Sequence, residues 1–222
     1  MGSGPQLADL DGDGKAELVS GGYDGRVYRW PRAADGSFGD RQVVVTLTGT
    51  EFRDPHVACH AADWDGDGRT DLLLGARHGE VLLARNEGKG FAPPVQLAAD
   101  GKPLKAPAAD AGPHAADWDG DGDLDLLVGD DRGRVTLYRN DGARAAPKLA
   151  AGETLVPERG GRFVEGRCKT SELCAMRAKP WVADWDGDGR PDLLVGDFHD
   201  HRAPGGHGNE HMHGWVWLYA RK

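Results

Sequence analysis

Asp63-Trp64-Asp65-Gly66-Asp67-Gly68 is an acidic stretch that occurs four times in this chain of 222 residues. The other copies begin at Asp9, Asp117 and Asp184, and three residues after each copy comes one more carboxylate. Carboxylates at loop positions 1, 3, 5 and 9, around a glycine at position 6, can converge on one hard cation, and Ca²⁺ prefers six to eight oxygens at about 2.3–2.6 Å. The repetition therefore predicts about four calcium ions. The predicted side-chain ligands are Asp9, Asp11, Asp13 and Glu17; Asp63, Asp65, Asp67 and Asp71; Asp117, Asp119, Asp121 and Asp125; and Asp184, Asp186, Asp188 and Asp192. The first loop is the poorest match, because Glu17 brings a longer arm into the same space.

The residues after each loop exclude an EF-hand. An EF-hand needs a glutamate at position 12 and a following helix. Here position 12 is Ser20, Leu74, Val128 or Val195, and it belongs to a short apolar run that ends in glycine. Such runs are typical of strands that are buried on both faces. The loop is therefore predicted to connect two strands.

A second glycine marks the repeat. The loops begin at intervals of 54, 54 and 67 residues, and Gly25, Gly79 and Gly133 each lie 16 residues after a loop start, whereas Gly214 lies 30 after the last. Each unit reads as strand, acidic loop, strand, tight hairpin, strand and a weaker fourth strand, for which Val43–Leu47 and Pro94–Leu97 are candidates. A repeat of about 50 residues with four strands predicts an all-β protein, a β-propeller of four blades.

The chain resembles the FG-GAP/VCBS repeat family, whose calcium loops also occur in the propeller of integrin alpha chains. The resemblance covers one domain, 5–222, with blades near 5–54, 55–108, 109–160 and 175–222. It implies a cation between strands 1 and 2 of each blade and a further ligand, the carbonyl at position 7. That carbonyl belongs to Lys15, Arg69, Asp123 and Arg190. The tryptophan at position 2 of three loops is expected to pack across neighbouring blades.

Closure of the ring is incomplete in the sequence, because the last blade ends directly after its third strand. Three explanations remain open: the chain is part of a longer propeller, a four-bladed ring left short, or half of an eight-bladed dimer. Residues 1–4, Met-Gly-Ser-Gly, are typical of an added expression leader, which favours an excised piece. An unpaired strand edge tends to recruit another strand, so self-association is expected.

Composition limits the class of partner. The formal net charge is −9, which four Ca²⁺ would bring to −1, and no basic stripe indicates nucleic-acid binding. No apolar stretch approaches a membrane span. Cys168 and Cys174 can form a small disulfide loop, which persists only in an oxidising compartment, so we expect a secreted or cell-surface protein. Cys59, in an apolar strand, is expected to be a small buried side chain.

The fourth unit departs from the others in two places. The connection before it is 13 residues longer, and its hairpin between strands 2 and 3 gains 14 residues within the histidine-rich stretch 199–213. Alternating strand directions place both departures on the face opposite the calcium loops. His60 and His114, at the start of strand 1, are predicted to lie near the axis, where Gln6 and Trp181 hold the same place. The candidate ligands of a second metal (Zn, Cu or Fe) are His60, His114, His199, His201, His207, His211 and His213, with Asp200, Glu210 and Met212 as extra donors. The alternative is a solvated loop without a metal.

Two functions follow from these observations. The favoured one is a non-catalytic module that binds a carbohydrate or an extracellular protein, as the family resemblance implies. Trp181 and Trp215 are the aromatic side chains available for stacking on a sugar, although packing between blades is the simpler role. The alternative is a metal-dependent enzyme that uses the histidine-rich insertion. No Ser/His/Asp or Cys/His arrangement with recognisable flanks favours it.

Overall fold

The computed structural model describes residues 4–47, 56–158, 163–164, 167–168, 176–200 and 212–221. Throughout these residues the regular structure is β-strand. The predicted all-β class is therefore confirmed. Within the same ranges, no helix has the length and apolar character needed to cross a bilayer.

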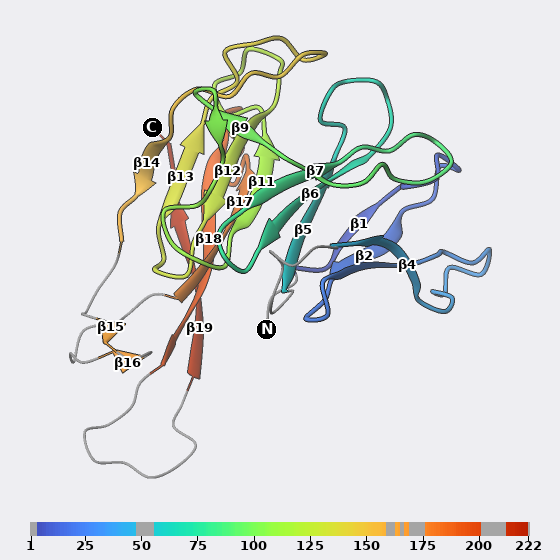
Figure 1. Cartoon of the computed structure of the whole chain (residues 1–222), viewed down its shortest axis with the longest axis horizontal. Helices are drawn as coiled ribbons and strands as arrows, with labels where there is room; N and C mark the ends of the chain where they lie inside the picture. Colours follow the sequence, from blue (N-terminus) through green and yellow to red (C-terminus); the bar gives the residue numbers. More distant parts are fainter. Residues whose placement is uncertain are drawn as a thin grey trace.

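Four sheets follow one another along the chain, and in each the strands pair antiparallel in sequence order. Together they form the four blades of the predicted propeller, and the predicted fourth strands of blades 1 and 2 form β4 and β8 (Figure 1). In the described residues blade 4 has three strands, as expected. Blade 1 contains β1 (Gln6–Ala8), β2 (Glu17–Gly21), β3 (Arg26–Trp30) and β4 (Gln42–Thr46); blade 2 contains β5 (Val57–Ala62), β6 (Asp71–Ala76), β7 (Val81–Ala84) and β8 (Val95–Gln96); blade 3 contains β11 (Gly112–Ala116), β12 (Asp125–Gly129), β13 (Val135–Tyr138) and β14 (Glu153–Val156); blade 4 contains β17 (Met176–Ala183), β18 (Asp192–Asp200) and β19 (Met212–Tyr219).

Two small hairpins lie outside the blades. β9 (Ala98–Ala99) pairs with β10 (Lys102–Pro103), and β15 (Phe163–Val164) pairs with β16 (Arg167–Cys168). The first hairpin turns at Asp100 and Gly101, which have φ of 49° and 70°. Two successive positive φ values are the requirement of a two-residue type I′ turn, which Asp-Gly satisfies well.

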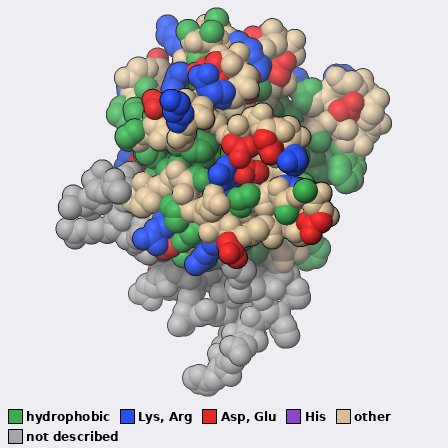
Figure 2. Space-filling model, turned by 90° about the vertical axis from the view of Figure 1, so that its right-hand side faces the viewer, with side chains coloured by type: hydrophobic (Ala, Val, Ile, Leu, Met, Phe, Trp, Pro, Cys, Tyr) green, Lys and Arg blue, Asp and Glu red, His purple; other side chains and the backbone are tan. Residues whose placement is uncertain are grey.

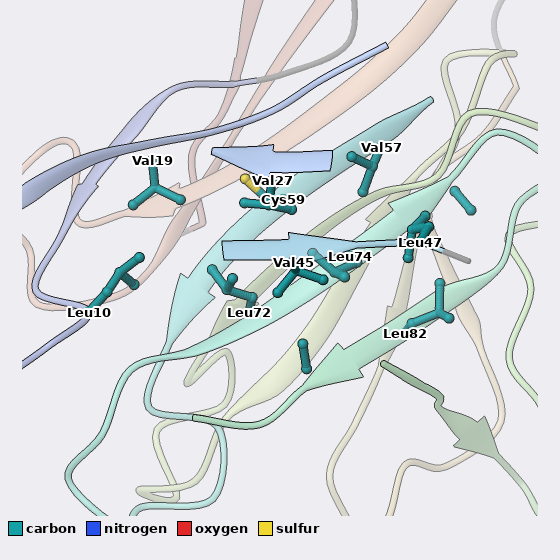
Figure 3. Close-up of a cluster of buried hydrophobic side chains, with 12 residues drawn as sticks. Leu10, Val19, Val27, Val45, Leu47, Val57, Cys59, Leu72, Leu74 and Leu82 are labelled. Atoms are coloured by element: carbon teal, nitrogen blue, oxygen red, sulfur yellow. The ribbon is translucent and has the colours of Figure 1, made fainter. Parts of the chain in front are cut away.

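The hydrophobic core consists of one cluster at each boundary between blades. Figure 3 shows the first, in which Val19, Val27 and Val45 of blade 1 meet Val57 and Leu72 of blade 2. Because both faces of a middle blade are covered, its strands are apolar on both sides, and β6 and β12 are buried along their whole length.

The residue at loop position 2 belongs to these clusters in the first three blades. Leu10, Trp64 and Trp118 are 5%, 2% and 6% exposed. The expected packing of tryptophan across blades is therefore confirmed for loops 2 and 3. It is wrong for Trp185, which is 63% exposed because no described blade follows blade 4.

The glycine that ends the second strand allows the next blade to approach. A Cβ added at Gly21, Gly75 or Gly129 would lie 2.2, 2.2 or 2.1 Å from a backbone oxygen of the following blade. No side chain fits such a gap. This close approach explains why the apolar run of these blades ends in glycine.

Strand packing connects blade 1 to blade 2, blade 2 to blade 3, and blade 3 to blade 4. In the described part of the chain no comparable packing connects blade 4 to blade 1, and the two blades lie at opposite sides of Figure 1. The β18–β19 hairpin extends beyond the body of the propeller, and its register continues to the pairs His199–His213 and Asp200–Met212. The ring is therefore open between its first and last blades.

Candidate functional site

The acidic loops connect the first two strands of every blade and share one backbone geometry. Their glycines at positions 4 and 6 have positive φ, such as 82° and 96° at Gly120 and Gly122. In loop 3 these two backbone N–H groups donate to the two oxygens of Asp117, at 2.7 and 3.0 Å, and loops 1 and 4 repeat the pattern. The aspartate at position 1 therefore orders the loop around its own carboxylate.

Three carboxylates converge in every loop. One oxygen from each lies within 4.8 Å of an oxygen of the others. The groups are Asp9, Asp11 and Asp13; Asp63, Asp65 and Asp67; Asp117, Asp119 and Asp121; and Asp184, Asp186 and Asp192. In loop 2, Oδ1 of Asp63 and Oδ1 of Asp65 are buried without a hydrogen-bond partner. Buried charged oxygens are costly without a partner, and a hard cation between them would remove that cost. The residues therefore fit a calcium ion.

The carboxylate at position 9 has a second role that spacing alone does not indicate. Asp125 is buried and accepts the backbone N–H of Asn140 at 2.8 Å and that of Trp118 at 3.1 Å. Asp192 makes the equivalent pair of bonds with Arg221 and Trp185. These bonds tie the loop to the end of the third strand. Burial raises the pKa of Glu17, Asp71 and Asp125 and thereby favours the neutral acid. A cation bound nearby would act in the opposite direction and favour the charged carboxylate.

Basic side chains neutralise part of the loop charge, and Figure 2 shows acidic side chains gathered with Lys and Arg beside them. Arg29 lies 3.2 Å from Asp11, and Arg139 lies 2.9 Å from Asp119. Exposed pairs of this kind contribute little, so a divalent cation would compete with them readily. At position 7 the N–H donates to the position-5 carboxylate; the predicted ligation by its carbonyl stays a prediction. The residues concerned are Lys15, Arg69, Asp123 and Arg190.

The first strand of each blade contributes one residue to a row of side chains that runs from blade to blade. The His60 and His114 ring centroids are 4.2 Å apart, and those of His114 and Trp181 are 4.8 Å apart. Gln6 donates to the carbonyl of Ala61, and the N–H of Val182 donates to Nε2 of His114 at 3.1 Å. Burial lowers the pKa of His60 to about 4 and that of His114 well below its ordinary value. The hydrogen bond occupies a metal-binding nitrogen of His114 and favours a role in joining blades.

A polar cluster on the opposite face was missed by the sequence analysis. The same repeat position holds His56 in blade 2, Asp110 in blade 3 and Arg177 in blade 4. Asp110 contacts the other two side chains. Nδ1 of His56 lies 3.1 Å from Oδ1 of Asp110, and Nε of Arg177 donates a hydrogen bond to Oδ2 of Asp110 at 2.8 Å. Nε2 of His56 is buried without a hydrogen-bond partner, beside a small pocket that Asp110, Arg177 and Lys179 also line. Burial raises the pKa of Asp110, but His56, Arg177 and Arg77 outweigh it and the net shift is downward.

Several predicted residues lie outside the described residues. These are His201, His207, His211, Glu210 and Cys174, while for His199, His213, Asp200, Met212 and Cys168 only the backbone is described. The second metal and the disulfide therefore stay predictions. Cys59 is buried and free, as expected, and burial raises the pKa of its thiol to about 12.

The fold and its acidic loops define a repeat β-propeller, and comparison with known families agrees. The FG-GAP-like repeat matches residues 9–74 and 63–128, together more than half of the chain. The chain belongs to the FG-GAP-like repeat family. No curated protein matches it significantly.

Solved structures similar to this chain include components of Tc toxins. The Tc holotoxin pore of Photorhabdus luminescens is 24% identical with a TM-score of 0.48, over 86% of this chain and 8% of that chain. TcdB2-TccC3 is 20% identical with a TM-score of 0.40, over 88% of this chain and 11% of that chain. The chain thus spans about a tenth of the length of these structures.

Proposed function

We propose that the chain is a calcium-loaded, secreted or cell-surface propeller that binds a carbohydrate or an extracellular protein without catalysing a reaction. The observation that carries this proposal is the convergence of three carboxylates in every one of the four loops. An arrangement repeated in each blade is expected of ions that stabilise the fold, because a catalytic centre is normally built once.

The cluster around Asp110 supports a binding role for the face opposite the loops. Arg77, Arg177 and Lys179 lie near Asp110, and Asp131 is a second carboxylate close enough to interact with Asp110, so basic groups still outnumber these two acidic ones. Arg77 is also partly exposed, with 37% of its side chain accessible. We expect this end of the axis to contact an acidic group on the ligand.

Calcium removal tests the first part of the proposal. At a free Ca²⁺ concentration of ten times the dissociation constant, each site adds about 1.4 kcal/mol, so four independent sites add roughly 6 kcal/mol. EDTA should therefore lower the melting temperature strongly, and added calcium should restore it. Asp67→Ala should destabilise the loaded protein more than Asp13→Ala, the same position in loop 1, because loop 1 is the poorest match. A melting curve that EDTA does not move contradicts the proposal.

Ligand screening tests the second part. The calcium-loaded protein is applied to a glycan array and to immobilised extracellular matrix proteins, with an EDTA-treated sample for comparison. For any ligand found, Arg77→Glu should weaken binding, whereas Lys102→Glu, on the outer β9–β10 hairpin, should not. Binding that is unaffected by Arg77→Glu places the ligand elsewhere.

A further inference from the structure

One face of blade 4 is built like an internal interface but is open to solvent. In blade 3 the corresponding face is formed by Trp118, Leu127, Val135 and Leu137, all buried against blade 4. The same register positions of blade 4 hold Trp185, Leu194, Val216 and Leu218. Trp185, Val216 and Leu218 are 63%, 72% and 46% exposed. We call these four residues the blade 4 face.

Gly196 also indicates that blade 4 is shaped to pack against a further blade. It ends the second strand of blade 4, as Gly21, Gly75 and Gly129 do in the earlier blades. Those three glycines are required by a backbone oxygen of the following blade, whereas a Cβ at Gly196 would meet only the oxygen of Lys179, at 3.9 Å. The position therefore suits a blade that no described residue supplies.

The complementary face lies at the other end of the chain. On blade 1, Leu7 is 58% exposed, and Leu18 and Trp30 are half-buried. In blades 2 and 3 the same positions pack on the preceding blade; they are Ala61, Leu72 and Ala84, and Ala115, Leu126 and Tyr138. We call Leu7, Leu18 and Trp30 the blade 1 face.

Arg32 extends this correspondence to a specific contact. It holds in blade 1 the position of Asn86 in blade 2, as their bridges to Phe38 and Phe91 show, and by register that of Arg221 in blade 4. Arg221 donates to the carbonyl of Trp118, and its guanidinium carbon lies 4.5 Å from the centre of the Trp118 ring. Arg32 of a neighbouring copy can reach Trp185 in the same way.

We propose that a second copy of this chain covers the blade 4 face. The blade 1 face of each copy packs on the blade 4 face of the other, with Arg32 over Trp185, and gives a closed dimer of eight blades. Each copy has one face of each kind, so two identical head-to-tail contacts leave neither face open. This inference depends on the fold and is independent of the proposed ligand.

Light scattering during size-exclusion chromatography tests the dimer. The calcium-loaded protein should have twice the 23.7 kDa mass of one chain across a concentration series. Leu218→Glu and Leu7→Glu should each be monomeric, because each destroys one of the two faces. Val95→Glu, at a site that is 68% exposed on outer strand β8, is the matched control and should stay dimeric. Arg32→Ala should weaken association at least about tenfold.

Mixing the two charged variants tests the head-to-tail arrangement. The Leu218→Glu copy keeps its blade 1 face and the Leu7→Glu copy keeps its blade 4 face, so the mixture should form a mixed dimer through one intact contact. Circular dichroism melts confirm that both variants are folded. A strictly monomeric wild type, a dimer that survives Leu7→Glu, or a mixture that stays monomeric overturns the proposal.

Discussion

At the scale of single residues, small structural differences between corresponding positions decide how the blades fit together. Gly129 allows the carbonyl of Ala178 to lie where a side chain would otherwise be, whereas Gly196 has open space at the same position. The two glycines end matching strands, so they form a natural pair for comparison.

Gly129→Ala should therefore destabilise the protein and Gly196→Ala should not. The added methyl group at residue 129 would force the blades apart, at a cost of about 1–3 kcal/mol. Both changes are made in the Leu218→Glu background, so that self-association does not contribute, and urea unfolding measures their stability. Equal losses from the two variants would contradict the role assigned to Gly129.

The row of axial side chains makes a second residue-scale prediction, on pH. In the folded protein the pKa of His60 is about 4, whereas in the unfolded chain it is 6.5. Falling pH between these values therefore favours unfolding, by on the order of 2 kcal/mol at pH 5. His60→Gln, which copies Gln6 of blade 1, should reduce the loss of stability between pH 6.5 and 5. An unchanged pH dependence would show that His60 is not buried in its neutral form.

At the scale of elements, the sequence predicts those parts of the structure that depend on the spacing of residues close together in the chain. The loops, the strands beside them and the short hairpins depend on residues a few positions apart, and these predictions agree with the strands of the structure. The cluster of His56, Asp110 and Arg177 was not predicted, because three different residue types at one repeat position show no common pattern. The second role of Asp125 was missed for another reason: the N–H groups that it binds are backbone, and every residue type supplies them.

The β18–β19 hairpin carries the element-scale prediction. Phe198 and Gly214 are paired directly, so replacing residues 199–213 with Asp-Gly should close a two-residue turn without disturbing the ladder below. Thermal melts should show nearly unchanged stability, and elemental analysis should show unchanged calcium content. The deletion should also remove any zinc, copper or iron bound by the histidine-rich insertion. A variant that fails to fold would contradict the view that the insertion is an addition to the β18–β19 hairpin that the blade does not need.

At the scale of the whole molecule, the four blades form an open series whose inner boundaries are closed by apolar clusters. Each boundary also joins one acidic loop to the following blade, since the position-2 residue of that loop is buried in the cluster there. Order in the loops and packing between blades are thus connected. Ions bound in the loops would therefore stabilise the entire series, and their loss should loosen it throughout.

The number of calcium ions bound per chain tests the central claim most directly. Protein stripped with EDTA is dialysed against buffered calcium, and bound metal and protein are measured by mass spectrometry of the elements and by amino-acid analysis. The four groups of carboxylates predict four calcium ions per chain. Asp117→Ala, which removes the residue that orders loop 3, should lower the number to three. A protein that retains its fold and binds no calcium would contradict the account.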